Sequence, residues 1–252
     1  MGYRLTIANM HPAGSGSPTG RKTASLLEVL AAVFTVHRNA SADGRPHLQL
    51  LLWRRAREPD AGRWALPGGV MWDTEDVDAS ARRQLAEKVD LQQVSHLEQT
   101  GVFSDPGRMP DIRMVATGFL GLVPMDADPT LPADTAWHPV DNLPDLAFDH
   151  AIIADRALQR LRAKLSYTNI GFALAPESFT LAELGRIYAA ALGHDVDVTN
   201  LQRILTRRGM LEPTGSTAPP GPTGGRPAAM YRFSVGEYRV TDPFAAFRPP
   251  GG

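Results

Sequence analysis

One helical pattern set among strand-like segments constrains the fold more than any other feature of the chain. Across residues 76–91, apolar residues recur at about every fourth position, which predicts a helix with one buried face. Residues 26–36 and 47–53 precede it, are rich in aliphatic side chains, and are separated by the turn signal Asp43-Gly44, as expected of two paired strands. The mixture predicts a domain that contains both a sheet and helices.

Further strand-like segments follow this helix. Residues 97–103, residues 112–123 and those around Trp137 have the composition of strands, and residues 150–165 have helical spacing. We therefore expect residues 25–165 to form one α+β domain.

The character of the sequence changes across residues 165–175, and we place a domain boundary there. Thr180 and Glu183 form a capping box, in which each side chain can satisfy a backbone donor of the other at the start of a helix over 180–192. The second domain is expected to span residues 166–240.

A second helix in this domain has two distinct faces. A capping box of Thr199 and Gln202 is expected to open it, and Gly209 to end it. Its apolar side consists of Leu201, Ile204 and Leu205. Its polar side carries residues at i, i+3 and i+7, namely Asn200, Arg203 and Arg207. This arrangement is typical of a recognition helix, although arginines on an amphipathic helix are more often a solvated face.

A hairpin is expected after this helix. Proline and glycine dominate residues 213–227, and residues 230–235 have the composition of a returning strand, which places Arg226 near the tip. Arginine is concentrated here, because residues 203–232 contain Arg203, Arg207, Arg208, Arg226 and Arg232 against Glu212 alone.

Composition narrows the class of protein. The chain has 252 residues, 43% of them hydrophobic, which is enough for a sizeable core. It has no cysteine, which excludes disulfides and thiolate metal sites, and we expect a cytoplasmic protein. The net charge of −1 gives no global attraction to nucleic acid, so any DNA contact must be local. No apolar run is long enough to span a membrane. Residues 1–24 and 241–252 are expected to be flexible tails.

The segment that starts at Gly69 reads GVMWDTEDVDASARRQLAEKVDL. It resembles the Nudix box, a pattern of G, five residues, E, seven residues and R-E-U-x-E-E-x-G-U, where U is aliphatic. Six positions agree with that pattern, namely Gly69, Glu75, Arg83, Leu85, Glu87 and Leu91. The surrounding GRWALPGG, SDPGRMPDIR and AWHPVDNLPDLAFDH are similar to landmarks of the ADP-ribose branch of the family. The resemblance implies an α/β/α sandwich with a mixed sheet.

The box departs from the pattern where active members bind metal. Carboxylates at the positions of Gln84, Glu87 and Lys88 share one helix face and can hold divalent cations against a diphosphate. Here Gln84 is neutral and Lys88 is positive, so metal-assisted hydrolysis should be crippled and no catalytic residue is expected. No cofactor is expected to be required, and a role for magnesium is doubtful. Asp90 replaces the consensus glycine, which suggests that the helix has drifted.

Three interpretations of this box stay open. The favoured one is effector binding without turnover, with Lys88 replacing the metal as a point charge. In the second, Lys88 turns to solvent and the domain is a scaffold; in the third, Glu75 and Glu87 sustain residual hydrolysis. The favoured interpretation predicts an effector site made of Pro67, Gly68, Gly69, Glu75, Arg83, Glu87, Lys88, Arg108, Arg113 and His150.

Several of these residues have a structural alternative. Arg83 is expected to pair with Glu75. Arg108 and Arg113 flank a turn, where a solvated charge and a phosphate or ribose contact are equally expected. His150 is more often a helix cap or core histidine than a ligand contact. The tryptophans are expected to be packing residues, although one could stack on adenine, and they are Trp53, Trp64, Trp72 and Trp137.

The C-terminal segments extend the resemblance. Helix, short connection, arginine-bearing helix and hairpin is the order of a winged helix-turn-helix. SFTLAELGRIYAAALG, VTNLQRILTRRGMLEPTG and GGRPAAMYRF are similar to segments of the Nudix-related transcriptional regulator (NrtR) family, apart from the insert STAPPGPT. The residues expected to contact DNA are Thr199, Asn200, Arg203, Arg207, Arg208 and Arg226.

Membership of that family implies a function. Its members are homodimers that repress genes of NAD metabolism by binding double-stranded operator DNA, and their Nudix domain senses ADP-ribose or a related nucleoside diphosphate. The alternative is an ADP-ribose pyrophosphatase with an accessory winged domain. A winged domain used only for protein contacts is a third interpretation, and it predicts no salt-dependent DNA binding.

Overall fold

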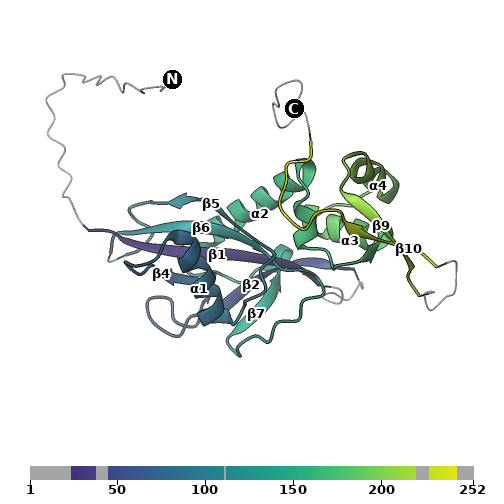
Figure 1. The fold of residues 1–252 in the computed structure, drawn as a ribbon. Coiled ribbons are helices and arrows are strands. Elements are labelled where there is room, and N and C mark those ends of the chain that lie inside the picture. The colour runs from purple at the N-terminus through teal and green to yellow at the C-terminus, as the bar shows by residue number, and fades with distance from the viewer. Residues whose placement is uncertain (1–23, 38–44, 111, 220–226, 243–252) are drawn as a thin grey trace, which may run out of the picture.

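The chain forms two modules that lie side by side in the computed structural model (Figure 1). The structure describes residues 24–37, 45–110, 112–219 and 227–242. The two predicted tails therefore lie almost wholly outside the described residues.

The N-terminal module is built on a mixed sheet, as predicted. Its main path runs β3-β2-β1-β6-β5, while β4 also pairs with β1 and β7 with β2. β1 and β6 are parallel, whereas the other pairs are antiparallel. The strands are β1 (Leu26–His37), β2 (His47–Arg54), β3 (Trp64–Ala65), β4 (Gly68–Val70), β5 (His96–Phe103), β6 (Met114–Leu122) and β7 (Thr135–Pro139).

Helices cover both faces of this sheet, because β1 is apolar on both sides. Its residues Val29, Ala31 and Val33 pack with the buried face of α1 (Val77–Val89). Its alternate residues pack with α2 (His150–Tyr167), and these are Leu30, Ala32 and Phe34. The period of two along the strand thus produces the predicted sandwich.

The ends of α1 explain where the helix begins and stops. The Asp76 side chain accepts a hydrogen bond from the Ala79 N–H at 2.8 Å, which caps the first turn. Asp90 takes a left-handed conformation with φ of 50°, and its N–H donates to the Leu85 carbonyl. The backbone thus keeps the geometry that favours glycine at this position, so Asp90 is not a sign of a drifted helix.

The C-terminal module is a winged helix, as predicted. Helices α3 (Leu181–Leu192) and α4 (Val198–Arg207) are followed by the hairpin β9 (Leu211–Thr217) and β10 (Ala229–Phe233). The short strand β8 (Phe179–Thr180) completes a sheet of order β8-β10-β9. Two short 3₁₀ turns complete the chain: η1 (Val140–Asn142) follows β7, and η2 (Ile170–Ala173) lies between α2 and β8.

One hydrophobic core continues from the Nudix-like module into the winged module. Leu161 and Leu165 of α2 belong to the same buried cluster as Ile187 and Tyr188 of α3. The domain boundary expected at residue 165 therefore falls within the last turns of α2, and the two modules share packing rather than only a linker.

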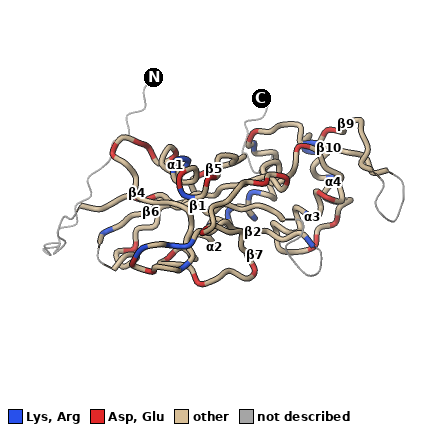
Figure 2. The backbone as a smooth tube through the Cα atoms, turned by 90° about the horizontal axis from the view of Figure 1, so that it is seen from below, with Lys and Arg blue, Asp and Glu red and all other residues tan. Residues whose placement is uncertain are grey.

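Charge is distributed without a dominant sign. Figure 2 shows basic and acidic positions interspersed along both modules.

Among the described residues, no helix is long and apolar enough to cross a membrane.

Candidate effector site and nucleic-acid interface

Arg83 lies at the centre of the Nudix-like box. It forms the predicted ion pair with Glu75, with Nη2 to Oε1 at 2.6 Å, and a second one with Glu87 at 3.0 Å. The guanidinium also lies 3.8 Å from the ring centroid of Trp72. Hydrogen bonds from Arg83 lower the pKa of the Glu75 carboxyl to about 2, so Glu75 stays ionised at neutral pH.

Gln84 joins α1 to the loop before the box. Its side chain is buried, and a Cβ on Gly69 would lie 2.7 Å from the end of the Gln84 amide, so a larger residue at position 69 would displace that side chain. With the amide oriented to satisfy both ends, Nε2 donates to the Gly68 carbonyl and Oε1 accepts from Arg83, each at 3.2 Å. The Pro67 carbonyl accepts from the Ala31 N–H at 2.9 Å, which holds the loop against β1. The glycine loop is thus fixed by both the sheet and the helix.

The box lacks two of the carboxylates to which the Nudix pattern assigns metal binding, because Gln84 and Lys88 stand at those positions. Glu75 and Glu87 both pair with Arg83, and Gln84 offers only an amide that is engaged with the loop. The Lys88 ammonium lies over Trp53, 5.1 Å from its ring centroid. Within the described part of the chain, no three His, Asp or Glu side chains gather closely enough to hold a metal ion.

Arg108 is neither a solvated turn charge nor an open ligand contact. Its side chain is 1% exposed and forms ion pairs with Glu28 of β1 and with Asp149, the latter at 2.8 Å. Burial lowers the pKa of Arg108, but the hydrogen bonds that Arg108 donates to Asp149 and Glu28 outweigh burial and raise that pKa. The expectation of a solvated charge was wrong, because the two carboxylates compensate the buried guanidinium.

Arg113 and His150 also hold the framework of this region. Arg113 donates to the Ser104 carbonyl at 2.9 Å, which ties down the turn after β5. His150 is 4% exposed, and its Nδ1 accepts a hydrogen bond from the Leu66 N–H at 3.0 Å. Burial lowers the pKa of His150 to about 4, so the ring is neutral at pH 7. His150 is a core histidine that supports the strand leading to the glycine loop.

The tryptophans divide into packing residues and one exposed ring. Trp53 and Trp137 pack against the core on the α1 side, and Trp64 packs against the other core. Trp72 is 56% exposed, so the expectation that it packs in the interior was wrong. It lies near the start of the box, between β4 and α1, where its ring stacks on Arg83.

Helix α4 begins two residues earlier than the sequence suggested. Asp197 is its N-cap, and its side chain accepts from the Asn200 N–H at 2.6 Å. Thr199 lies inside the first turn and is exposed, so it is not the cap. The sequence offers two overlapping capping patterns, and the aspartate is at least as good an N-cap as a threonine.

The faces of α4 separate as predicted. Leu201 and Leu205 are buried in the core of the winged module. The opposite face is open to solvent and carries Asn200, Arg203 and Arg207. Arg203 Nη2 donates to Asn200 Oδ1 at 2.7 Å, so the two side chains are aligned on the exposed surface. The exposed face of α4 therefore offers the guanidinium donors of Arg203 and Arg207, and the side-chain amide of Asn200 adds a donor and an acceptor.

The other arginines have different positions. Arg208 is largely buried and donates to the Ser166 carbonyl and to Asp242, each at 2.8 Å, so it joins the two modules. Arg232 on β10 pairs with Glu212 on β9 across the hairpin at 3.2 Å. Arg226 lies outside the described residues. The guanidinium of Arg208 is already hydrogen-bonded within the protein, so Arg208 is not part of the exposed face of α4.

Two family models cover most of the chain. Residues 30–161 match the NUDIX domain, and residues 171–233 match the NrtR DNA-binding winged helix domain. The "ADPR responsive transcriptional repressor NtrR" of Acinetobacter baylyi is 31% identical over 225 residues, which cover 86% of each chain. The chain belongs to the NrtR family.

Solved structures agree with this NrtR architecture. The crystal structure of Shewanella oneidensis NrtR complexed with a 27mer DNA matches at a TM-score of 0.68 and 29% identity, over 82% of this chain and 93% of that one. A MutT/nudix family protein from Enterococcus faecalis has the same fold, with a TM-score of 0.68 at 22% identity, over 84% of this chain and 89% of that one.

Sequence reasoning located the NrtR modules but missed several contacts within them. The Arg108 ion pairs join residues 41 and 80 positions apart, and no local pattern indicates such pairs. The bond between Arg208 and Asp242 was missed for the same reason. The Asp197 cap did have a local signal, an aspartate three residues before Asn200 at the start of an amphipathic stretch.

Proposed function

We propose that the chain is a transcriptional repressor that binds duplex DNA through α4 and the β9–β10 wing, and that its Nudix module senses ADP-ribose. The observation that carries the proposal is the exposed face of α4, on which Asn200, Arg203 and Arg207 stand clear of the core. The relatives described as a repressor and as a DNA complex support the same role.

The chemistry of this face suits a major groove. Arginine donates bidentately to guanine, and asparagine pairs with adenine through both its donor and its acceptor. Thr199 is exposed on the first turn of α4, where a hydroxyl can reach a phosphate. Arg226 at the wing is proposed to contact a phosphate or a minor groove. The net charge of −1 gives the chain no overall attraction to DNA, so the arginines of the winged module are proposed to supply a local attraction.

The Nudix module is proposed to bind its effector without turning it over. The loop from Pro67 to Gly69 presents backbone groups held by β1 and Gln84, while Arg83 satisfies the remaining box carboxylates. Effector binding is therefore proposed to require no divalent ion, with Lys88 leaving Trp53 to meet the diphosphate. The name of the Acinetobacter relative supports ADP-ribose as the effector.

A homodimer is part of this proposal. One winged helix offers a single recognition helix, and two copies reach half-sites about one turn of DNA apart. Exposed apolar side chains on the neighbouring strands β1 and β4 and just after β4 offer a surface for a second copy, and they include Leu26, Leu27, Val70 and Trp72. Genes of NAD metabolism are the proposed targets, and a location in the cytoplasm is part of the same proposal.

Removing one arginine of the α4 face tests this function. We expect Arg203→Ala or Arg207→Ala to weaken binding of a duplex from upstream of the encoding gene by about tenfold or more, because a bidentate base contact contributes about 1–3 kcal/mol. Fluorescence anisotropy measures the duplex affinity, and calorimetry measures the ADP-ribose affinity, which should not change.

The matched control is Arg156→Ala, which removes an exposed arginine of α2 away from this face. Equal losses of DNA and ADP-ribose affinity in the α4 variants, or an equal loss of DNA binding in the α2 control, would contradict the assignment.

A further inference from the structure

One pair of side chains on the exposed face of α4 is held together without any DNA. Arg203 Nη2 donates to Asn200 Oδ1 at 2.7 Å, and both residues are exposed. The turn beneath the pair is also fixed, because the Asn200 N–H donates to Asp197 Oδ1 at 2.6 Å. The pair therefore has a defined arrangement in the first half of α4, and the N-terminal residues of a recognition helix are those that contact base edges.

This hydrogen bond limits what Asn200 can read. An asparagine that reads adenine accepts from the base N6 through Oδ1 and donates to the base N7 through Nδ2. A guanidinium only donates, so the end of the Asn200 amide that faces Arg203 is its oxygen. An adenine would compete with Arg203 for that oxygen. In the observed arrangement Asn200 supports Arg203 and is not set up to pair with an adenine.

The same hydrogen bond prepares Arg203 for guanine. A guanidinium carries more N–H donors than one acceptor can use, so two donors remain for the O6 and N7 atoms of guanine. A long arginine side chain loses rotamer freedom when it binds a base, and the bond to Asn200 has already restricted Arg203. Arg207 differs, because its side chain forms no hydrogen bond or ion pair with another described residue.

We propose that Arg203 reads a guanine in the major groove and that Asn200 is the positioning residue that orients its guanidinium. This inference rests on the proposed function, because it needs α4 to lie in a major groove. It goes further by assigning one base to one residue, and by giving Asn200 a role other than the adenine contact that its residue type suggests.

Selection from a randomised duplex library with the full-length chain identifies a preferred duplex for the test. Each guanine of that duplex is then replaced in turn by adenine, with the matching change on the other strand, or by 7-deazaguanine, which lacks the N7 acceptor. Fluorescence anisotropy gives the ratio of the affinities for guanine and for its replacement, which is the guanine ratio. At one position we expect a ratio of about tenfold or more, and Arg203→Ala should bring it to about one.

Variants of Asn200 distinguish a positioning residue from a residue that contacts a base itself. Asn200→Ala should lower the guanine ratio at the Arg203 position by about threefold or more, because the guanidinium loses its support. Asn200→Asp keeps an acceptor for Arg203 and should keep the ratio, although its negative charge weakens binding of every duplex. In an Arg203→Ala background, Asn200→Ala should lower the ratio no further, since the two residues act as a unit.

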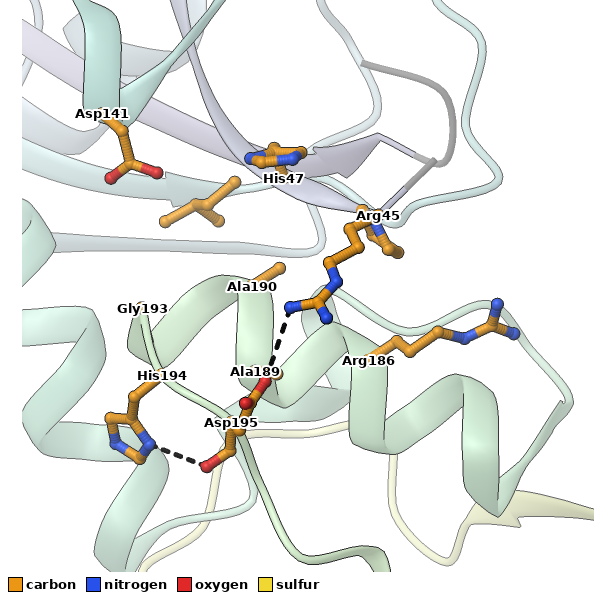
Figure 3. A pocket seen from close by; sticks show the side chains of 11 residues that line it. Arg45, His47, Asp141, Arg186, Ala189, Ala190, Gly193, His194 and Asp195 are labelled. Atoms are coloured by element: carbon orange, nitrogen blue, oxygen red, sulfur yellow. Dashed lines mark hydrogen bonds and ion pairs between the residues drawn. The ribbon is translucent and has the colours of Figure 1, made fainter. Parts of the chain in front are cut away.

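Two other arginines of the winged module are matched controls. Arg207→Ala should lower the affinity but leave the guanine ratio at the Arg203 position unchanged. Arg186 is exposed on α3, and Figure 3 shows its side chain extending from that helix beside a cavity of about 540 Å³ between β2 and α3. Arg186→Ala should also leave the ratio unchanged, because even a phosphate contact carries no base preference. The melting temperature of each variant checks that it is folded.

Three results would overturn the proposal: a guanine ratio that never depends on Arg203, a ratio that Asn200→Ala leaves intact, or an equal loss of the ratio in Arg207→Ala. A preference for adenine that disappears in Asn200→Ala would show that Asn200 reads a base itself. These results would leave the proposed function standing, because the chain still binds DNA. If the full-length chain binds no duplex at low ionic strength, the proposed function and this inference both fail.

Discussion

At the scale of the residue, Arg83 shows how the glutamates that remain in the box are held in place. In the Nudix pattern, carboxylates on this face of the helix serve metal ions, but here the guanidinium joins Glu75 and Glu87 and stacks on Trp72. The two substitutions at Gln84 and Lys88 and the pair of Arg83 with Glu75 could be read from the sequence, whereas the second pair, with Glu87, required the structure.

Arg108 is expected to be the most sensitive charged residue of the N-terminal module. Arg108→Met keeps the bulk of the side chain but leaves Glu28 and Asp149 without their shared partner in a buried position. We expect a loss of about 3–5 kcal/mol in the free energy of unfolding, measured in urea. Arg156→Met, at an exposed site, should change it by less than about 0.5 kcal/mol. A loss below about 1 kcal/mol for Arg108→Met would show that these pairs are not structural.

His150 predicts how stability depends on pH. Its folded-state pKa of about 4 lies below the ordinary value of 6.5, because burial disfavours the charged ring. The unfolded chain thus binds a proton more readily, so stability is full above pH 6.5 and falls as the pH drops from 6.5 toward 4. The contribution is on the order of 3 kcal/mol at most.

Urea unfolding of the unaltered chain and of His150→Gln at pH 7.5 and pH 5 measures this effect. The fall in stability between the two pH values should be clearly smaller in the variant. Glu75 and Glu98, whose pKa values are both lowered to about 2, lose their contributions only below pH 4.5 and do not interfere. An equal fall in both proteins would contradict the assignment of the titrating group to His150.

At the scale of elements, local patterns predicted most helices and strands but not every boundary. Strands β1 and β2 and helices α1 to α4 follow from apolar spacing, because each buries a regular face. The start of α4 was misplaced because Thr199 and Asp197 both precede plausible capping partners, and only the backbone geometry shows which side chain accepts the bond.

The two candidate caps of α4 make a matched test. Asp197→Ala should destabilise the chain by about 1 kcal/mol, since it removes the side-chain acceptor for the Asn200 N–H. It should also weaken DNA binding, because that turn positions the recognition face. Thr199→Ala should leave the free energy of unfolding nearly unchanged, although its DNA affinity can fall through a lost phosphate contact. A larger stability loss from Thr199→Ala than from Asp197→Ala would reverse the assignment.

At the scale of the whole molecule, the junction between modules could not be predicted from sequence. Two domains were expected with a boundary at residue 165, but α2 continues to Tyr167 and its core merges with that of α3. Lys164 adds a polar link, because its ammonium pairs with Glu98 of β5 at 2.8 Å and donates to the Tyr238 hydroxyl at 2.6 Å. These contacts join segments that are far apart in sequence, so no local pattern indicates them.

The central claim is that a Nudix module without a metal site controls a winged helix that binds DNA. The most direct measurement is an anisotropy titration of a labelled upstream duplex with the full-length chain in EDTA, with and without ADP-ribose. The account predicts salt-dependent binding that ADP-ribose weakens by about tenfold, a coupling of 1–3 kcal/mol, with the ADP-ribose recovered intact. Failure to bind any duplex at low ionic strength, or an ADP-ribose effect that appears only with added divalent ions, would contradict it.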